Sequence, residues 1–97
     1  NYPAPEVELR IVAHEAGVDT LTAQKLVGLA QALRRLSDHD LEETVSTRLL
    51  VMSARLVASG LGLRAACRAA IVDALTDDFD TAAALDEVVR AVVGDAD

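Results

Sequence analysis

An arginine beside a serine and a threonine, at the start of an apolar helix, is the arrangement in this sequence best suited to bind an anion. In the stretch LEETVSTRLLVMSARL, residues 41–56, Ser46 can cap a helix and Arg48 falls in its first turn. A helix N-terminus already presents unpaired N–H groups and a positive dipole, so a cation there is less favourable than an acid. These features indicate a phosphate or other anion site. The residues alone leave open a second interpretation, in which Arg48 binds no ligand.

The other titratable residues predict little chemistry. His14 and His39 are expected to be partly exposed structural residues rather than bases or ligands. Asp86 and Arg90, four residues apart, are expected to form a weak surface pair. The remaining arginines are expected on polar helix faces, solvated or lying along apolar surface: Arg10, Arg34, Arg35, Arg64, Arg68 and Arg90.

Motifs of catalysis and metal binding are absent from the sequence. It contains no GxxxxGK[ST] phosphate loop, no glycine-rich dinucleotide turn and no Ser/His/Asp or Cys/His set, so we expect no catalytic residue in this chain. The acidic stretch at 38–43, DHDLEE, lacks the alternating ligands and the glycine of a calcium loop, so we expect no metal site. The single cysteine, Cys67, cannot form an internal disulfide, and its surroundings, RAACRAAI, predict a buried position in a helix.

The composition indicates the fold class. The chain has 97 residues, of which 52% are hydrophobic, and it contains one Phe, one Tyr and no Trp. A core of small and aliphatic side chains suits closely packed helices. We therefore expect an all-α protein with a single helical-bundle domain of about five helices.

The charge excludes some partners. A net charge of −7 opposes the phosphate neutralisation on which nucleic-acid binding depends, so we expect no nucleic-acid partner. Residues 73–97 hold eight acidic residues and one base, which is typical of a solvated end and occasionally of an acidic docking surface. Apolar runs are too short to span a membrane, and the opening NYPAPEVELR is no signal sequence, so we expect a cytoplasmic chain with no membrane partner.

The spacing of apolar residues, together with capping residues and glycines, predicts where the helices begin and end. We expect helices at about 5–16, 20–36, 47–59, 63–75 and 81–93, with a surface loop at 37–44. The helix at 47–59 carries apolar residues around most of its circumference and is expected to be the most buried. The expected caps are Asp19 or Thr20, Ser46 and Asp80, and the expected terminators are Gly17, Gly60 and Gly94.

Four blocks of the sequence resemble a known family. HEAGVD at 14–19, LEETVSTRLLVMSARL at 41–56, RAACRAAI at 64–71 and LTDDFD at 75–80 are similar to the C-terminal domain of the CbbQ/NirQ/NorQ family, in the MoxR branch of AAA+ ATPases. The resemblance covers residues 5–93. It implies a linker at 1–4 from a missing N-terminal α/β AAA+ subdomain, a helical lid domain at 5–94 and an acidic tail at 95–97.

The resemblance also implies a role for Arg48. In AAA+ proteins the lid closes over bound nucleotide and supplies a "sensor 2" arginine that reaches the ATP phosphates, and the arginine of STR matches it. ATP and Mg would be cofactors of the parent protein, with none expected on the isolated domain. Implied partners are the N-terminal subdomain, neighbouring subunits of a ring, which is a hexamer by analogy, a von Willebrand factor A domain protein, and a client enzyme such as Rubisco or nitric oxide reductase.

Some positions depart from the family pattern. Thr44 stands where glycine is expected, and Ala74 stands where proline is expected, which puts loop geometry in doubt but leaves Arg48 untouched. The alternative from another class is a free-standing acidic helical module for protein–protein interaction, with no nucleotide role. This alternative has no explanation for Arg48.

Overall fold

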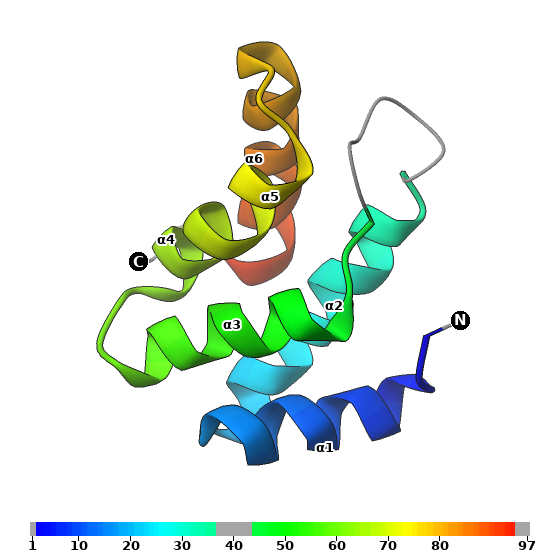
Figure 1. Ribbon diagram of the computed structural model, residues 1–97, viewed down its shortest axis with the longest axis vertical. Coiled ribbons are helices and arrows are strands. Elements are labelled where there is room, and N and C mark those ends of the chain that lie inside the picture. The colour runs from blue at the N-terminus through cyan, green and yellow to red at the C-terminus, as the bar shows by residue number, and fades with distance from the viewer. Residues whose placement is uncertain (1, 37–43, 95–97) are drawn as a thin grey trace.

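The regular structure of this protein is helical. The computed structural model describes residues 2–36 and 44–94, and no strand occurs in these two ranges, which confirms the all-α prediction. Five helical segments follow one another (Figure 1): α1 (Pro5–Ala16), α2 (Thr20–Arg34), α3 (Thr47–Ala58), the continuous run of α4 (Leu63–Cys67), η1 (Arg68–Val72) and α5 (Asp73–Leu75), and α6 (Phe79–Val93).

Side-chain caps begin three of these helices. The Asp19 carboxylate accepts from the Thr22 N–H at 2.8 Å, and the Ser46 hydroxyl accepts from the Leu49 N–H at 3.3 Å, so both predicted caps are confirmed. The prediction of Asp80 as a cap is wrong. Asp78 caps α6 instead, because its extended backbone lets the carboxylate accept from both the N–H and the hydroxyl of Thr81, each at 2.8 Å.

Glycines end α1 and α3 as predicted. Gly17 has φ of 73° and its N–H donates to the Ala13 carbonyl, while Gly60 has φ of 114°. α2 ends at Arg34, two residues earlier than predicted, and Arg35 and Leu36 form a turn. The predicted helix at 63–75 is one continuous run, but its middle, Arg68–Val72, is π-helical. Most of the predicted loop at 37–44 lies outside the described residues.

The helices form two groups that pack against each other. α1, α2 and α3 form one group, and the α4–η1–α5 run and α6 form the other. α1 and α3 lie side by side and run in the same direction (Figure 1), since Thr47 contacts Glu8 while Arg55, two turns further along α3, lies 3.6 Å from Glu15. α2 packs against both of them. The α4–η1–α5 run and α6 form a helical hairpin, in which α4 and η1 contact α3 while α6 contacts α2.

α2 is the helix most deeply buried in this arrangement, so the prediction that α3 would be is wrong. Leu26, Leu29 and Leu33 of α2 have no exposed surface, whereas Met52 of α3 is 42% exposed. The reason is that α2 is covered by α1, α3 and α6 together, while one side of α3 stays open to solvent. Completely buried side chains from the other helices complete the core: Val12, Leu50, Ile71, Leu75 and Val89.

Cys67 lies in this core, as predicted. Its side chain has no exposed surface, and its sulfur is 3.8 Å from the Ser53 hydroxyl, which is equally buried. Burial raises the pKa of the Cys67 thiol to about 11, because the thiolate would lose its hydration. Cys67 is therefore a structural residue that stays protonated at neutral pH. In the two described ranges, no helix is both long and apolar enough to cross a membrane.

Candidate functional site

Arg48 is exposed in the first turn of α3. Across residues 2–36 and 44–94, no group forms a hydrogen bond or an ion pair with its side chain. The N–H groups of Leu49 and Leu50 both donate to the Ser46 carbonyl, at 3.1 and 3.3 Å. The N–H groups of Thr47 and Arg48 have no acceptor in the described parts of the chain. This helix end therefore offers an uncompensated guanidinium beside free backbone donors.

The segment that leads into α3 is anchored by a buried ion pair between α1 and α2. Arg34 Nη1 and Nη2 donate to the two carboxylate oxygens of Glu8, at 2.9 and 2.6 Å. The side chains are 11% and 1% exposed, respectively. The prediction of a solvated Arg34 is wrong, because its planar fork matches a carboxylate that itself points into the protein.

The same pair holds the backbone on both sides of the Ser46 cap. Arg34 Nε donates to the Val45 carbonyl at 2.8 Å, and the Thr47 hydroxyl donates to Glu8 Oε2 at 2.7 Å. Val45 is itself buried, at 1% exposure. We call Glu8, Arg34 and Thr47, with the Val45 carbonyl, the α3 clamp.

Tyr2 extends this contact set towards solvent. Its ring lies over the Arg34 guanidinium, 3.7 Å from ring centroid to the guanidinium carbon, which is a cation–π arrangement. Its hydroxyl is hydrogen-bonded to the Thr44 hydroxyl. Residues 44, 45 and 47 are thus each held by a side chain from a different part of the chain: Tyr2, Arg34 and Glu8.

The clamp keeps Glu8 ionised. Burial by itself raises the pKa of a carboxyl group, but the hydrogen bonds from Arg34 and Thr47 and the Arg34 charge outweigh it, so the pKa of Glu8 lies below the ordinary value of 4.5. The negative charge of Glu8 also balances the positive charge of Arg34. Among the residues that the structure describes, Arg48 is therefore the uncompensated cation at this end of α3.

A second arginine cluster lies between the α4–η1 run and α6. Arg64 and Arg68, each predicted to lie on a polar helix face, both donate to the Asp86 carboxylate, at 2.9 Å and at 3.1 to 3.2 Å. These hydrogen bonds lower the pKa of Asp86, the bond from Arg64 most strongly. The predicted pair of Asp86 with Arg90 is wrong. Asp86 faces the α4–η1 run instead, and Arg90 is 2.6 Å from Glu87.

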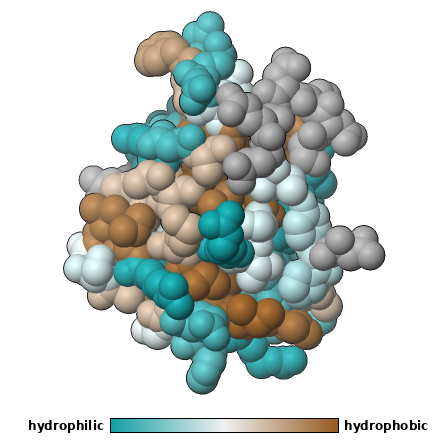
Figure 2. All heavy atoms as spheres, viewed as in Figure 1, coloured by the Kyte–Doolittle hydropathy of each residue, from teal (hydrophilic) through white to brown (hydrophobic). Residues whose placement is uncertain are grey.

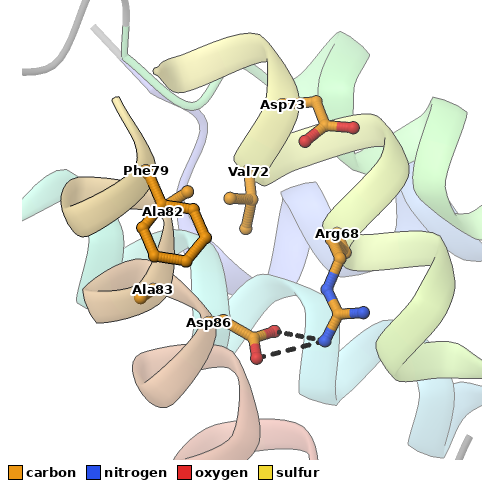
Figure 3. Close-up of a pocket in the computed structure, with 7 residues that line it drawn as sticks. All are labelled: Arg68, Val72, Asp73, Phe79, Ala82, Ala83 and Asp86. Carbon is orange, nitrogen blue, oxygen red and sulfur yellow. Dashed lines mark hydrogen bonds and ion pairs between the residues drawn. The ribbon is translucent and has the colours of Figure 1, made fainter. Parts of the chain in front are cut away.

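A groove lies beside this second cluster, between η1 and α6 (Figure 3). Val72 and the ring of Phe79 face each other across it, with the Arg68–Asp86 pair at one end. Phe79 is 84% exposed. The other exposed large apolar side chains come from separate parts of the fold, and Figure 2 shows that the apolar surface of one face is divided into patches by hydrophilic residues.

The family can be identified from comparisons with known proteins. The family model described as CbbQ/NirQ/NorQ C-terminal matches residues 8–92 of this chain. The chain belongs to this family. The resemblance predicted from the four sequence blocks is thereby confirmed, and both the α3 clamp and Arg48 lie within the matched range.

Three relatives of this CbbQ/NirQ/NorQ C-terminal domain show how much of a longer protein it covers. The denitrification regulatory protein NirQ of Pseudomonas aeruginosa is 52% identical over 89 residues, which are 92% of this chain and 34% of that protein. Protein CbbQ of Hydrogenophilus thermoluteolus is 51% identical over 85 residues, 88% of this chain and 32% of that protein. Protein NorQ of Paracoccus denitrificans is 42% identical over 94 residues, which are 97% of this chain and 35% of that protein. The chain spans about a third of the length of these relatives.

The remaining candidate residues of this CbbQ/NirQ/NorQ-family chain do not gather into a site. His14 is exposed in the last turn of α1, and His39 lies outside the described residues. In the parts of the chain that are described, no three His, Cys, Asp or Glu side chains are placed to hold a metal ion. Arg48 is the sequence-predicted residue whose surroundings suit a ligand.

The α3 clamp of this family member was not predicted from the sequence. Glu8 and Arg34 are 26 residues apart, and Glu8 and Thr47 are 39 apart, so no local spacing links them. One signal was available: Glu8 lies one helical turn before Val12, which has no exposed surface, so this acid shares the inward face of α1. An acid on that face requires a cationic partner.

Proposed function

We propose that this chain is the C-terminal lid subdomain of a MoxR-type AAA+ ATPase, in which Arg48 contacts the terminal phosphate of bound ATP as the sensor 2 arginine. The observation that carries the proposal is an exposed Arg48 with no partner in the described residues, at a helix N-terminus, in a chain of the CbbQ/NirQ/NorQ C-terminal family. The proposed division of the chain is a linker at 1–4, the lid at 5–94 and an acidic tail at 95–97.

The residues of this chain suit one contact to a nucleotide and no more. Arg48 offers the three donor nitrogens of one guanidinium on a flexible stem, and the sequence holds no phosphate loop. The rest of the nucleotide and its Mg would be held by the N-terminal subdomain, so the isolated domain should bind no nucleotide. Mg-ATP would supply the phosphoryl group that is transferred to water.

Arg48 would couple the state of the nucleotide to the position of the lid. Its guanidinium would donate charge-assisted hydrogen bonds to the terminal phosphate, and it would lose this acceptor when ADP remains. A lid that binds the triphosphate state better than the diphosphate state shifts between closed and open positions as hydrolysis proceeds. The chain would thereby act as a conformational element of a chaperone and would donate no group to the chemical step.

Partners follow from the same proposal. The lid would contact its own N-terminal subdomain and the neighbouring subunits of a ring, a hexamer in the parent protein. A protein with a von Willebrand factor A domain would link the ring to a client enzyme, such as Rubisco or nitric oxide reductase. ATP hydrolysis would remodel or activate that client.

The test compares Arg48→Ala with the unchanged full-length protein. We expect the affinity for a slowly hydrolysed ATP analogue to fall roughly 10- to 100-fold, because one charge-assisted interaction is lost. The affinity for ADP should stay the same, since ADP lacks the γ-phosphate, which is the terminal phosphate of ATP that Arg48 would contact. Both affinities can be measured by titration calorimetry, with ATP turnover measured in parallel.

Arg55→Ala is the matched control for this experiment. Arg55 lies on the same helix and is 59% exposed, but it points to Glu15 of α1. We expect this variant to keep both nucleotide affinities. If Arg48→Ala and Arg55→Ala behave alike, the sensor assignment of Arg48 is wrong.

The alternative function is a helical interaction module with no nucleotide role. The observation in its favour is Phe79, which is 84% exposed beside the groove between η1 and α6. In that case Arg48→Ala would change no nucleotide affinity or turnover in the full-length protein. Phe79→Ala would instead weaken the complex with the partner protein.

A further inference from the structure

We propose that Thr47, Glu8 and Arg34 are positioning residues for Arg48, and that the α3 clamp sets the direction in which the Arg48 side chain leaves the first turn of α3. This inference rests on the proposed function, because it gives the clamp a role in phosphate contact as well as in stability. The observation behind it is that one buried ion pair holds the residues immediately before and after the Ser46 cap.

The clamp fixes the chain where a helix is least constrained by itself. The first-turn N–H groups of a helix have no intrahelical acceptor, and the ends of helices fray. Here the Val45 carbonyl is bound by Arg34 and the Thr47 hydroxyl is bound to Glu8, so the helix start has two side-chain attachments to other helices. Because the first turn of α3 is held at Val45 and at Thr47, it is less free to rotate or unwind.

Because Thr47 and Arg48 are successive residues of one helix, holding the Thr47 side chain in place also fixes the direction in which the Arg48 side chain points. Successive residues of a helix point about 100° apart around its axis. With Thr47 held towards Glu8 of α1, Arg48 must point away from that contact, where it is exposed. A guanidinium donates best along defined directions, so a fixed starting point lowers the conformational entropy that phosphate contact would cost.

Thr47 is the member of the clamp that can be tested without destroying the fold. Removing Glu8 or Arg34 would leave the other charge buried and unpaired, which would destabilise the whole domain. Removing the Thr47 hydroxyl leaves Glu8 with both of its bonds from Arg34. Thr47→Val keeps the size and the branching of the side chain and deletes the bond between Glu8 and the first residue of α3, while the bond from Arg34 to the Val45 carbonyl remains.

The experiment is a double-mutant cycle in the full-length protein. Affinities for a slowly hydrolysed ATP analogue and for ADP are measured for the unchanged protein, Thr47→Val, Arg48→Ala and the double variant. We expect Thr47→Val to lower the preference for the analogue over ADP by about two- to tenfold, the loss typical of one hydrogen bond. In the Arg48→Ala background the same change should have no further effect, because Thr47 acts through Arg48.

Two controls separate positioning from general stability. Thr47→Ser keeps the hydroxyl and should retain the preference for the analogue. Thr81→Val deletes a hydroxyl–carboxylate bond of similar length, 2.8 Å to Asp78, in the first turn of α6, and should also leave the preference unchanged. Equal losses from Thr47→Val in both backgrounds, or a loss from Thr81→Val of the same size, would overturn the positioning role.

A separate measurement distinguishes failure of this inference from failure of the proposed function. Amide hydrogen exchange at Leu49 and Leu50 reports opening of the first turn of α3 and needs no nucleotide. We expect exchange at these amides to become about two- to tenfold faster in Thr47→Val. If exchange is unchanged, the clamp does not hold the helix start and the inference fails. If exchange rises while Arg48→Ala keeps the full preference for the analogue, the sensor assignment fails instead, and the positioning role fails with it.

Discussion

The two arginine clusters of this protein are built from the same groups but differ in how the arginines and carboxylates are paired. In one cluster Arg64 and Arg68 share the single carboxylate of Asp86 at the surface. In the other cluster Glu8 is matched to Arg34 inside the protein, and Arg48 lies nearby with no partner in the described residues. An arginine that has no carboxylate partner is therefore a better candidate for anion binding than a group of arginines that already share a carboxylate.

Burial is the second difference between the clusters. Glu8 is 1% exposed, whereas Asp86 is 19% exposed and Arg68 is 53% exposed. Water competes for the groups of the Asp86 cluster and screens their charges, but it has little access to Glu8. The Glu8–Arg34 pair therefore constrains the fold strongly, while the Asp86 cluster joins η1 and α4 to α6 more weakly.

The largest effect expected from this comparison is on stability. Glu8→Ala should lower the free energy of unfolding by about 3 to 5 kcal/mol, because it leaves the Arg34 charge buried without its partner. Asp86→Ala should lower it by about 1 to 2 kcal/mol, because Arg68 is 53% exposed and Asp86 is 19% exposed, so water can partly replace the lost contacts. Urea unfolding of the two variants measures the difference. Equal losses would show that burial does not separate the two clusters.

Acid should weaken the two clusters in sequence. The pKa values of Glu8 and Asp86 are both lowered in the folded chain, from ordinary values of 4.5 and 3.8. The stability that each contributes is fully present above its ordinary value and is lost as the pH falls through its folded value. We expect Glu8→Gln to flatten the decline of stability below pH 4.5 and Asp86→Asn to flatten it only below pH 3.8. Unfolding free energies measured between pH 7 and pH 2 check this order, and an unaltered slope in Glu8→Gln would contradict it.

Arg48 should have the smallest effect on stability. Arg48→Ala removes a cation from the positive end of α3 and introduces a strong helix former, so the free energy of unfolding should stay the same or rise by a few tenths of a kcal/mol. Thermal unfolding beside Arg55→Ala, on the same helix, provides the measurement. A loss of more than about 1 kcal/mol would show that Arg48 has a structural partner, and the contrast with Arg34 would disappear.

Much of the fold could be predicted because its signals are local. Asp19 and Ser46 were predicted as caps from residue type and position, and Gly17 and Gly60 as terminators from their place after an apolar stripe. The cap of α6 was misplaced by two residues, because Asp78 and Asp80 are both capable of capping and local sequence does not rank them. The π-helical turn at Arg68–Val72 had no signal in the sequence analysis.

The candidate site likewise has one part that local sequence predicted and another part that it did not. Arg48 was predicted from the electrostatics of one helix end, which depends on residues adjacent in the chain. The α3 clamp was not predicted, because Glu8, Arg34 and Thr47 meet only when α1, α2 and α3 pack together. The same limit explains the error over Arg34, since an arginine on a polar stripe has the same local pattern whether it faces water or another helix. It also explains the error over the pair of Asp86 with Arg90, because Asp86 is bound by arginines of α4 and η1.

The sequence by itself determined the helical class of this protein, two of the three side-chain caps, the glycine terminators, the burial of Cys67 and the position of Arg48 at a helix start. These properties follow from periodicity, backbone preference and hydrogen bonding within a few residues. The tertiary structure alone decided which carboxylate each arginine binds, which helix lies deepest and how the start of α3 is held. Those outcomes depend on distances between residues that are far apart in the chain, and such distances are set only when the helices pack.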